Sequence, residues 1–462
     1  MEERQFPSSF LFGAASSGPQ AEGSFDKPHE NVMDAWYRMR PQDFFDGVGP
    51  ATASDFYHRY DGDFQLMKEC GFNSFRTSIQ WSRLIRDLET GEPDETALRY
   101  YHDLFASAKK HGIRLIINLH HFDLPFTLLE QYGGWTSRHV VDLFVKYVHT
   151  AFVHFGDEID LWTTFNEPMV IPEAGWLDGF HWPKYRGRGK DAVQIMYHLC
   201  LASALAIREY RSLGKKGKIG IVLNLTPAYP RSDSPRDQEA AEFADDFYNR
   251  FFLMPSVKGT FPEKLIRLLK AENVCFKAQP EDAALIRNNT VDFLGVNYYH
   301  PKRVRARETE LSASEWTPAL YFEEYDKPGI RLNPYRGWEI YPPAVYEIAK
   351  TVQNDYGNIP WYISECGMGV EDEERFRNAE GVIEDDYRIE FYEEHLRELL
   401  RAMKEGSACF GFHAWTAFDC WSWNNAYKNR YGFISVDLPS QKRTVKKSGR
   451  WLRRLADSGN LG

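Results

Sequence analysis

The chain has 462 residues, of which 43% are hydrophobic and 15% are aromatic, and its formal net charge at pH 7 is −10. This composition supplies enough apolar side chains for a large core. The acidic balance argues against a nucleic-acid binder or a protein that docks on anionic membranes, because both usually need basic surfaces.

The six cysteines show no C-x-x-C pair and no zinc-like spacing, which is typical of a reduced intracellular protein. The first residues, Met1 to Pro7, lack the apolar region of a signal peptide. No apolar run approaches the ~18 residues of a membrane span. We therefore expect a cytoplasmic protein with no membrane partner.

Strand-like runs rich in Ile, Val, Phe and Trp alternate with amphipathic helical patterns from one end of the chain to the other. The predicted strands are Phe10–Ala15, Asn73–Ile79, Arg114–His120, Asp160–Phe165, Lys218–Leu225, Val291–Tyr299, Pro360–Ser364 and Cys409–Thr416. The predicted helices include Ala97–Lys110, Arg138–Phe155, Ala192–Arg211, Glu239–Met254 and Asp386–Glu405, and the basic stretch Lys442–Arg454 is expected to be an exposed terminal helix.

Eight strand–helix units over this length predict an α/β fold, a (β/α)₈ TIM barrel. No low-complexity linker or shift in composition marks a boundary, so residues 1–462 are expected to form a single domain with long βα loops. A doubly wound open sheet is the alternative. The chain lacks the G-x-G-x-x-G that would favour it after a first strand.

Two glutamates follow apolar strands, Glu167 after Asp160–Phe165 and Glu365 after Pro360–Ser364. A carboxylate in such a place is costly to desolvate unless it has a partner or a use. In a barrel, the strand ends meet at one mouth, where the chemistry takes place. Two carboxylates converging there are what glycoside hydrolysis requires.

Several segments carry a resemblance to a known family. They are residues 10–17 with 20–23, residues 76–83 (RTSIQWSR), 121–125 (HFDLP), 164–168 (TFNEP), 297–299 (NYY), 363–367 (ISECG) and 430–433 (RYGF). In this order, they resemble the β-glycosidases of glycoside hydrolase family 1 over almost the full length of the chain.

The resemblance implies a retaining enzyme in which Glu167 is the general acid/base and Glu365 the nucleophile, with carboxyl groups ~5–5.5 Å apart. Arg76, Tyr299 and Asn297 match residues that support the nucleophile. The implied sugar contacts are Gln20, His121, Asn166 and Trp415, with Asn166 at the 2-hydroxyl, and Trp338 resembles a wall of the aglycone site. Trp423 is expected in the site and Trp421 in the core.

No cofactor is implied, and no metal is expected, because His120 and His121 lack a third ligand at suitable spacing. We interpret His120 as structural. Cys366, beside the second glutamate, has no cation near it in sequence and is interpreted as passive.

Substrate choice depends on the segment after the last strand. Plain β-glucosidases of the family have Glu where this chain has Ser422, whereas members acting on 6-phosphorylated sugars have Ser with a downstream Lys and Tyr. Ser422 and Tyr431 fit the second pattern, and they could donate hydrogen bonds to a phosphate dianion that a carboxylate would repel. The lysine fits poorly, since Lys428 lies one residue early, before Asn429.

The favoured prediction is a 6-phospho-β-glucosidase acting on a small-molecule β-glycoside. An unphosphorylated β-glucoside or a 6-phospho-β-galactoside remains open, as does transfer to a sugar acceptor in place of water. A carbohydrate-binding barrel without catalysis is the alternative from another class, but such proteins usually lack one glutamate. The aglycone and the oligomeric state are left open.

Overall fold

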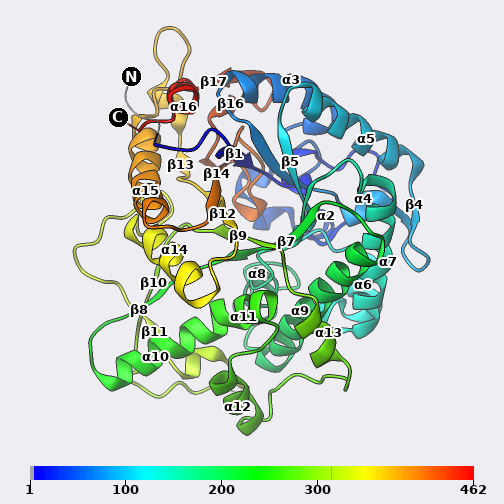
Figure 1. Cartoon of the computed structure of the whole chain (residues 1–462), viewed down its shortest axis with the longest axis vertical. Coiled ribbons are helices and arrows are strands. Elements are labelled where there is room, and N and C mark those ends of the chain that lie inside the picture. Colours follow the sequence, from blue (N-terminus) through cyan, green and yellow to red (C-terminus); the bar gives the residue numbers. More distant parts are fainter. Residues whose placement is uncertain (1–4, 314, 462) are drawn as a thin grey trace.

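The computed structural model describes residues 5–313 and 315–461. Eight parallel strands close into a barrel in the order β1-β14-β12-β9-β7-β6-β5-β2 (Figure 1). The predicted (β/α)₈ barrel is therefore confirmed, and each predicted strand corresponds to one barrel strand. The strands are β1 (Leu11–Ala15), β2 (Ser74–Ser78), β5 (Arg114–His120), β6 (Leu161–Asn166), β7 (Lys218–Asn224), β9 (Phe293–Asn297), β12 (Trp361–Cys366) and β14 (Cys409–Trp415).

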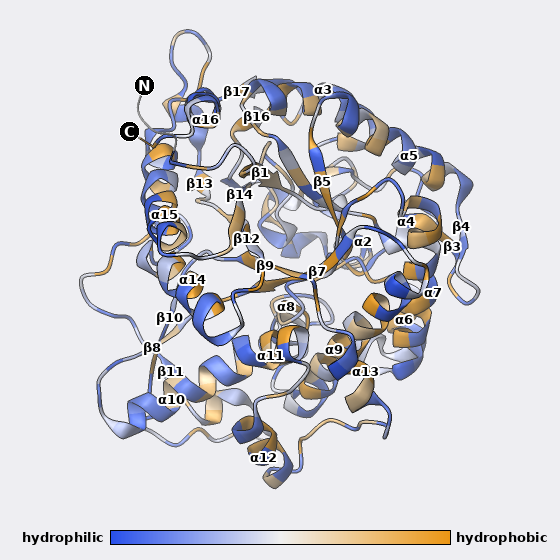
Figure 2. Ribbon diagram, viewed as in Figure 1, coloured by the Kyte–Doolittle hydropathy of each residue, from blue (hydrophilic) through white to orange (hydrophobic). Residues whose placement is uncertain are grey.

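The barrel strands are buried along nearly their whole length, as their continuous apolar sequences predict. Figure 2 shows hydrophobic residues on several of the central strands, and hydrophilic and hydrophobic residues mixed along the surrounding helices. One contact inside the barrel requires a glycine. A Cβ at Gly13 of β1 would come within 2.2 Å of the His413 ring on the neighbouring β14, so only glycine leaves room for that histidine.

Helices surround the barrel, and most predicted ones are found within a few residues of their expected bounds. The principal helices are α3 (Phe56–Glu69), α5 (Glu95–Lys110), α7 (Arg138–Phe155), α9 (Gly189–Ser212), α12 (Glu263–Ala271), α13 (Asp282–Asn288), α14 (Pro343–Asp355), α15 (Asp386–Lys404) and α16 (Lys447–Ser458). Helix α5 begins where it does because the Asp94 side chain caps its first turn, accepting hydrogen bonds from the backbone N–H groups of Thr96 and Ala97.

The predicted helix Glu239–Met254 is instead three consecutive helical segments. They are α10 (Pro235–Asp245), a π-helical stretch at Asp246–Arg250 and α11 (Phe251–Lys258). The apolar pattern found the helical region, but it could not locate the wider turn, which changes the hydrogen-bonding step without changing the residue types.

The basic stretch Lys442–Arg454 also differs from its prediction as an exposed helix. Its first residues form β17 (Arg443–Val445), which pairs with β16 (Ile434–Val436), and α16 begins only at Lys447. Lys446 is fully buried. Its neighbours turn out to be carboxylates, as described below.

The two ends of the described chain lie side by side (Figure 1), where the backbone N–H of Gln5 donates to the carbonyl of Gly459 over 3.1 Å. Across residues 5–313 and 315–461, no helix combines the length and the apolar character needed to cross a bilayer.

Candidate active site

A cavity of about 320 Å³ opens where the barrel strands reach their carboxyl ends, within the size range of small-molecule sites. It brings together residues that are far apart in the sequence. Its lining includes Gln20, His121, Phe122, Glu167, Glu173, Asn224, Asn297, Tyr299, Lys302, Arg336, Trp338, Glu365, Trp415, Ser422, Trp423 and Tyr431.

Glu365 lies near the end of β12, and its carboxylate receives two donors. The Arg76 guanidinium, from β2, forms a buried ion pair with one carboxylate oxygen. The Tyr299 hydroxyl donates to the other oxygen over 2.6 Å. Arg76 is in turn fixed by donating to the carbonyl of Ser16 and the hydroxyl of Ser364. These donors compensate a negative charge on Glu365 and leave it oriented toward the cavity.

Glu167 follows β6 and has a different environment. Its carboxylate accepts a 2.8 Å hydrogen bond from the side-chain amide of Asn297, and no ion pair reaches it within the described residues. This corrects the sequence-based prediction that Asn297 supports Glu365. The backbone of Asn297 does pair with Glu365 across the β9–β12 ladder, but its side chain turns to Glu167 and Asn166.

The electrostatic consequence is a carboxyl group that holds its proton. Burial, together with the negative charge of Glu365, raises the pKa of Glu167 from 4.5 to about 8, against the opposing effects of the Asn297 hydrogen bond and Arg76. The backbone is also strained here, since Glu167 has φ of 46°, and the cavity residues Phe122 and Trp423 have φ of 61° and 53°. Such left-handed conformations cost free energy and cluster at functional sites.

A chain of polar contacts links the two carboxylates and includes His121, which lines the cavity. His121 lies between the Arg76 guanidinium, at 3.3 Å, and the Asn166 side-chain amide, at 3.2 Å. Burial and the nearby Arg76 charge hold the pKa of His121 well below 6.5, so the ring is neutral. Its neighbour His120 is buried against Trp135, with a pKa lowered to about 3 by burial, and it faces away from this chain of contacts.

The glycosyl hydrolase family 1 model matches residues 2–460 of the chain. The chain belongs to glycosyl hydrolase family 1. It is 49% identical over 460 residues to the 6-phospho-beta-glucosidase GmuD of Bacillus subtilis strain 168, covering 99% of this chain and 98% of the relative. A 6-phospho-beta-galactosidase of Clostridium acetobutylicum is 32% identical and covers 98% of this chain and 97% of its own.

A solved structure supports the same assignment. The family 1 β-glucosidase from Thermotoga maritima superposes with a TM-score of 0.90 at 29% identity, covering 99% of each chain. The resemblance seen in the sequence is thus confirmed for the family, and this glycosyl hydrolase has relatives that are named for phosphorylated and for plain sugars.

Most of the predicted site residues lie in or next to the cavity of this glycosyl hydrolase. Their roles stay predictions. Lys428 is an exception. Its ammonium pairs with Glu371 over 3.2 Å, its side chain is 42% exposed, and it lies outside the lining of the cavity. Trp421 is fully buried in a cluster with Phe44, as predicted for a core residue.

The thiol of Cys366 is buried, and burial raises its pKa far above 9, as expected for a passive cysteine. No group of three or more His, Cys, Asp or Glu side chains in the described parts of the chain is placed to hold a metal ion.

Several cavity residues were not found by sequence reasoning. Asn224 is one of them, and it lines the cavity at the end of β7. Glu173 begins a short π-helical segment, Lys302 begins the short strand β10 (Lys302–Arg305) and Arg336 lies in a turn, so no periodic pattern points to them. Burial raises the pKa of Glu173 to about 7, although the nearby Lys302 charge opposes this rise.

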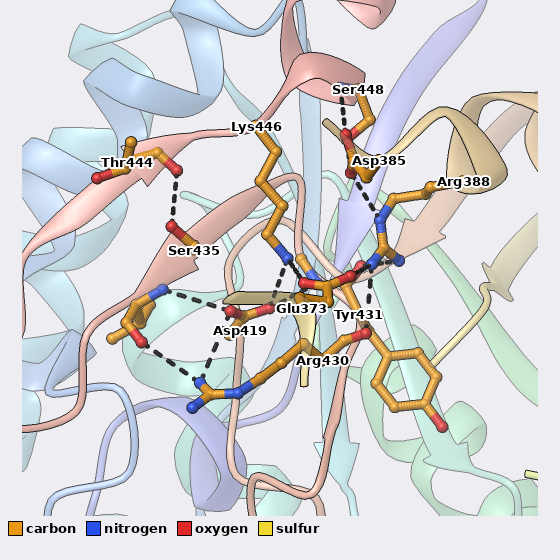
Figure 3. Close-up of polar contacts among 12 residues, drawn as sticks. Glu373, Asp385, Arg388, Asp419, Arg430, Tyr431, Ser435, Thr444, Lys446 and Ser448 are labelled. Atoms are coloured by element: carbon orange, nitrogen blue, oxygen red, sulfur yellow. Dashed lines mark hydrogen bonds and ion pairs between the residues drawn. The ribbon is translucent and has the colours of Figure 1, made fainter. Parts of the chain in front are cut away.

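A buried ionic cluster holds the segment that carries Ser422 and Tyr431 (Figure 3). Lys446 pairs with Glu373 and, over 3.1 Å, with Asp419. Arg388 also pairs with Glu373, and it donates to the carbonyl of Tyr431 over 2.9 Å. In Figure 3, the Tyr431 ring points away from this cluster.

The negative charge of Asp419 is compensated by nearby cations. Burial alone would raise the pKa of Asp419, but the charges of Lys446 and Arg430 bring it below 3.8. The cluster therefore holds the backbone of the loop around Tyr431, while the Tyr431 side chain lines the cavity.

Proposed function

We propose that this family 1 glycosyl hydrolase cleaves β-glycosides by double displacement, with Glu365 as nucleophile and Glu167 as general acid and base. One observation carries the proposal, namely that two carboxyl groups share one cavity in opposite environments. Glu365 is held by a cation and a hydroxyl. Glu167 has a pKa raised to about 8 by burial and by the charge of Glu365. Environments that separate two carboxyls in this way assign the base and the acid.

In the first step, a carboxylate oxygen of Glu365 forms a bond to the anomeric carbon while the bond to the leaving oxygen breaks. Glu167 transfers its proton to that oxygen. In the second step, a water oxygen bonds to the anomeric carbon, Glu167 takes the water proton, and the ester to Glu365 breaks. Two inversions leave the β-configuration unchanged.

The sugar favoured by the cavity is a 6-phosphorylated glucoside. The segment after β14 contributes Ser422, Trp423 and Tyr431 to the lining, and none of them is acidic. A carboxylate in place of Ser422 would repel a phosphate, which carries between one and two negative charges near pH 7. The relative that shares 49% identity is named a 6-phospho-beta-glucosidase. Unphosphorylated β-glucosides are the second candidate, favoured by the neutral Asn429 where phosphate-specific members have lysine.

The nucleophile is tested by Glu365→Gly, which should abolish hydrolysis of an aryl β-glucoside 6-phosphate. Proton NMR of the wild-type reaction should show the β-anomer of the sugar as the first product. Undiminished hydrolysis by the variant, or the α-anomer appearing first, would contradict the mechanism. Product analysis at high acceptor concentration would separate hydrolysis from transfer.

The phosphate preference is tested by comparing kcat/KM on p-nitrophenyl β-glucoside, its 6-phosphate, and the galactoside 6-phosphate. We expect the glucoside 6-phosphate to be the best substrate. Ser422→Glu should lower kcat/KM on the phosphorylated glucoside far more than on the neutral one, because the new charge faces the phosphate. A wild-type enzyme that prefers the neutral glucoside would refute this part of the proposal.

A further inference from the structure

Arg336 is a cation in the cavity wall. It lies between β11 (Glu323–Glu324) and α14, and its guanidinium carbon is 4.3 Å from the ring centre of Trp338. Within residues 5–313 and 315–461, no carboxylate forms an ion pair with it, and its buried Nε has no hydrogen-bond partner. Lys302, the other lysine or arginine lining the cavity, is bound to Glu324 over 2.6 Å.

The backbone ties Arg336 to the segment that carries Tyr431. Asn333 accepts from the backbone N–H groups of Arg336 and Gly337, and its side chain donates to the carbonyl of Gly369 over 3.0 Å. Gly369 packs directly on Tyr431, because a Cβ there would come within 2.4 Å of the tyrosine ring. Two turns from different loops are thus fixed against each other.

The positive charge of Arg336 affects the pKa of Tyr431. Burial raises the pKa of Tyr431, and the positive charge of Arg336 is the first influence that opposes this rise. Neither the Tyr431 hydroxyl nor the Ser422 hydroxyl has a hydrogen-bond partner among the residues that the structure describes. Tyr431 is therefore within electrostatic reach of Arg336, and Ser422 lines the same cavity.

The cations on the segment after β14 are engaged elsewhere. Lys428 pairs with Glu371, and Arg430 lies 3.7 Å from Asp419 within the buried cluster. Asn429 is neutral, and its side-chain oxygen accepts from Asn425 over 2.8 Å. A phosphate dianion held by Ser422 and Tyr431 would therefore need its counter-charge from another loop.

We propose that Arg336 is the specificity-determining cation that binds the 6-phosphate of the glycone, together with the hydroxyls of Ser422 and Tyr431. This inference rests on the proposed phosphate preference and names the residue that creates it. A guanidinium remains charged at every working pH and can donate two parallel hydrogen bonds to a phosphate. Stacking on Trp338 holds its plane before the substrate arrives.

The test compares Arg336→Met with the wild type on p-nitrophenyl β-glucoside and on its 6-phosphate. Losing a hydrogen-bonded charge pair should lower kcat/KM on the phosphorylated substrate by about 10- to 100-fold more than on the neutral one. Arg336→Lys should restore part of the preference, because it keeps the charge and loses the planar fork. Competitive inhibition by inorganic phosphate should weaken in Arg336→Met.

Arg331→Met is a matched control. It removes an arginine from the same segment, but Arg331 pairs with Glu394 at the surface and is 53% exposed. It should change neither substrate ratio nor phosphate inhibition. If Arg331→Met shifts the ratio as much as Arg336→Met does, the inference is overturned.

The failure of this inference can be told from the failure of the proposed function. If the wild type prefers the phosphorylated glucoside and Arg336→Met lowers both substrates equally, or neither, then Arg336 does not bind the phosphate and only this inference is overturned. If the wild type prefers the neutral glucoside, both are overturned.

Discussion

The pKa of Glu167 leads to a quantitative prediction about the pH dependence of bond cleavage. The first step needs Glu167 protonated, so kcat/KM should fall as pH rises through the pKa of that group. Burial and the charge of Glu365 raise this pKa to about 8. The perturbations are therefore a change of pH and the substitution Glu167→Gln, which cannot donate an acidic proton.

The magnitude follows from the fraction of enzyme that is protonated. With a pKa of about 8, roughly 90% of Glu167 holds its proton at pH 7 and roughly 10% at pH 9. At the ordinary value of 4.5, only about 0.3% would be protonated at pH 7. General acid catalysis typically supplies a factor of about 10² to 10⁴, so Glu167→Gln should cost that much on a poor leaving group.

The assay is the pH profile of kcat/KM on two aryl β-glucoside 6-phosphates. An alkyl- or phenyl-type leaving group needs a proton and should show a basic limb near pH 8. A dinitrophenyl leaving group departs as an anion, so its basic limb should be much weaker, and Glu167→Gln should hardly affect it. The phosphate of the substrate ionises near pH 6 and affects only the acidic limb.

Two results would refute this reasoning. One is a basic limb near pH 5 with the poor leaving group, which would mean that the environment of Glu167 does not retain its proton. The other is a limb near pH 8 that persists in Glu167→Gln, which would assign the titration to another group.

Three further predictions concern single side chains. Glu365→Gln should lower the pKa of Glu167, because it removes the second cause of the shift, and carbon-13 NMR titration of the glutamates would measure it; an unchanged value would contradict the pairing of the two carboxyls. Tyr299→Phe removes a donor to Glu365 and should lower kcat by about 10- to 100-fold at similar thermal stability. Lys446→Met removes the ammonium shared by two buried carboxylates, which Arg388 and Arg430 then compensate only in part, so the free energy of unfolding in urea should fall by about 3–5 kcal/mol, whereas a loss below 1 kcal/mol would show that the two arginines suffice.

The barrel could be predicted from the sequence because its strands are buried on both faces. Segments such as Lys218–Leu225 are apolar without alternation, and eight of them separated by helical patterns leave few other folds. The interruption near Asp246–Arg250 could not be predicted, because a π-helical stretch of 5 residues changes the hydrogen-bonding step over about one turn, which is too short to alter the apolar pattern. Burial of Lys446 was hidden for another reason. Its carboxylate partners come from segments far away in the sequence.

Some residues of the site could likewise be predicted from the sequence, and others could not. Glu167, Glu365 and Tyr299 lie at or just after the ends of barrel strands, so the rule for strand ends predicts them at one mouth, whereas Arg76 lies within β2. Lys428 was predicted in the cavity because members of the family that act on 6-phosphorylated sugars have a lysine downstream of the serine, although Lys428 lies one residue early. A shift of one residue in a loop turns its side chain toward Glu371 instead. Arg336 had no sequence signal at all, since loops of this length follow no period.

The architecture therefore separates the residues of the proposed chemistry from those of the proposed choice of sugar. The carboxylates and their donors sit on or directly after barrel strands, and their contacts cross a parallel ladder in which each strand fixes the next. The residues facing the proposed phosphate come from two loops. The buried cluster around Lys446 holds the loop with Tyr431, and the side chain of Asn333 ties the loop with Arg336 to Gly369. Substitutions on these loops can change the charge met by the sugar while Glu167 and Glu365 keep their partners, which is a physical reason why one barrel can serve relatives named for phosphorylated and for plain sugars.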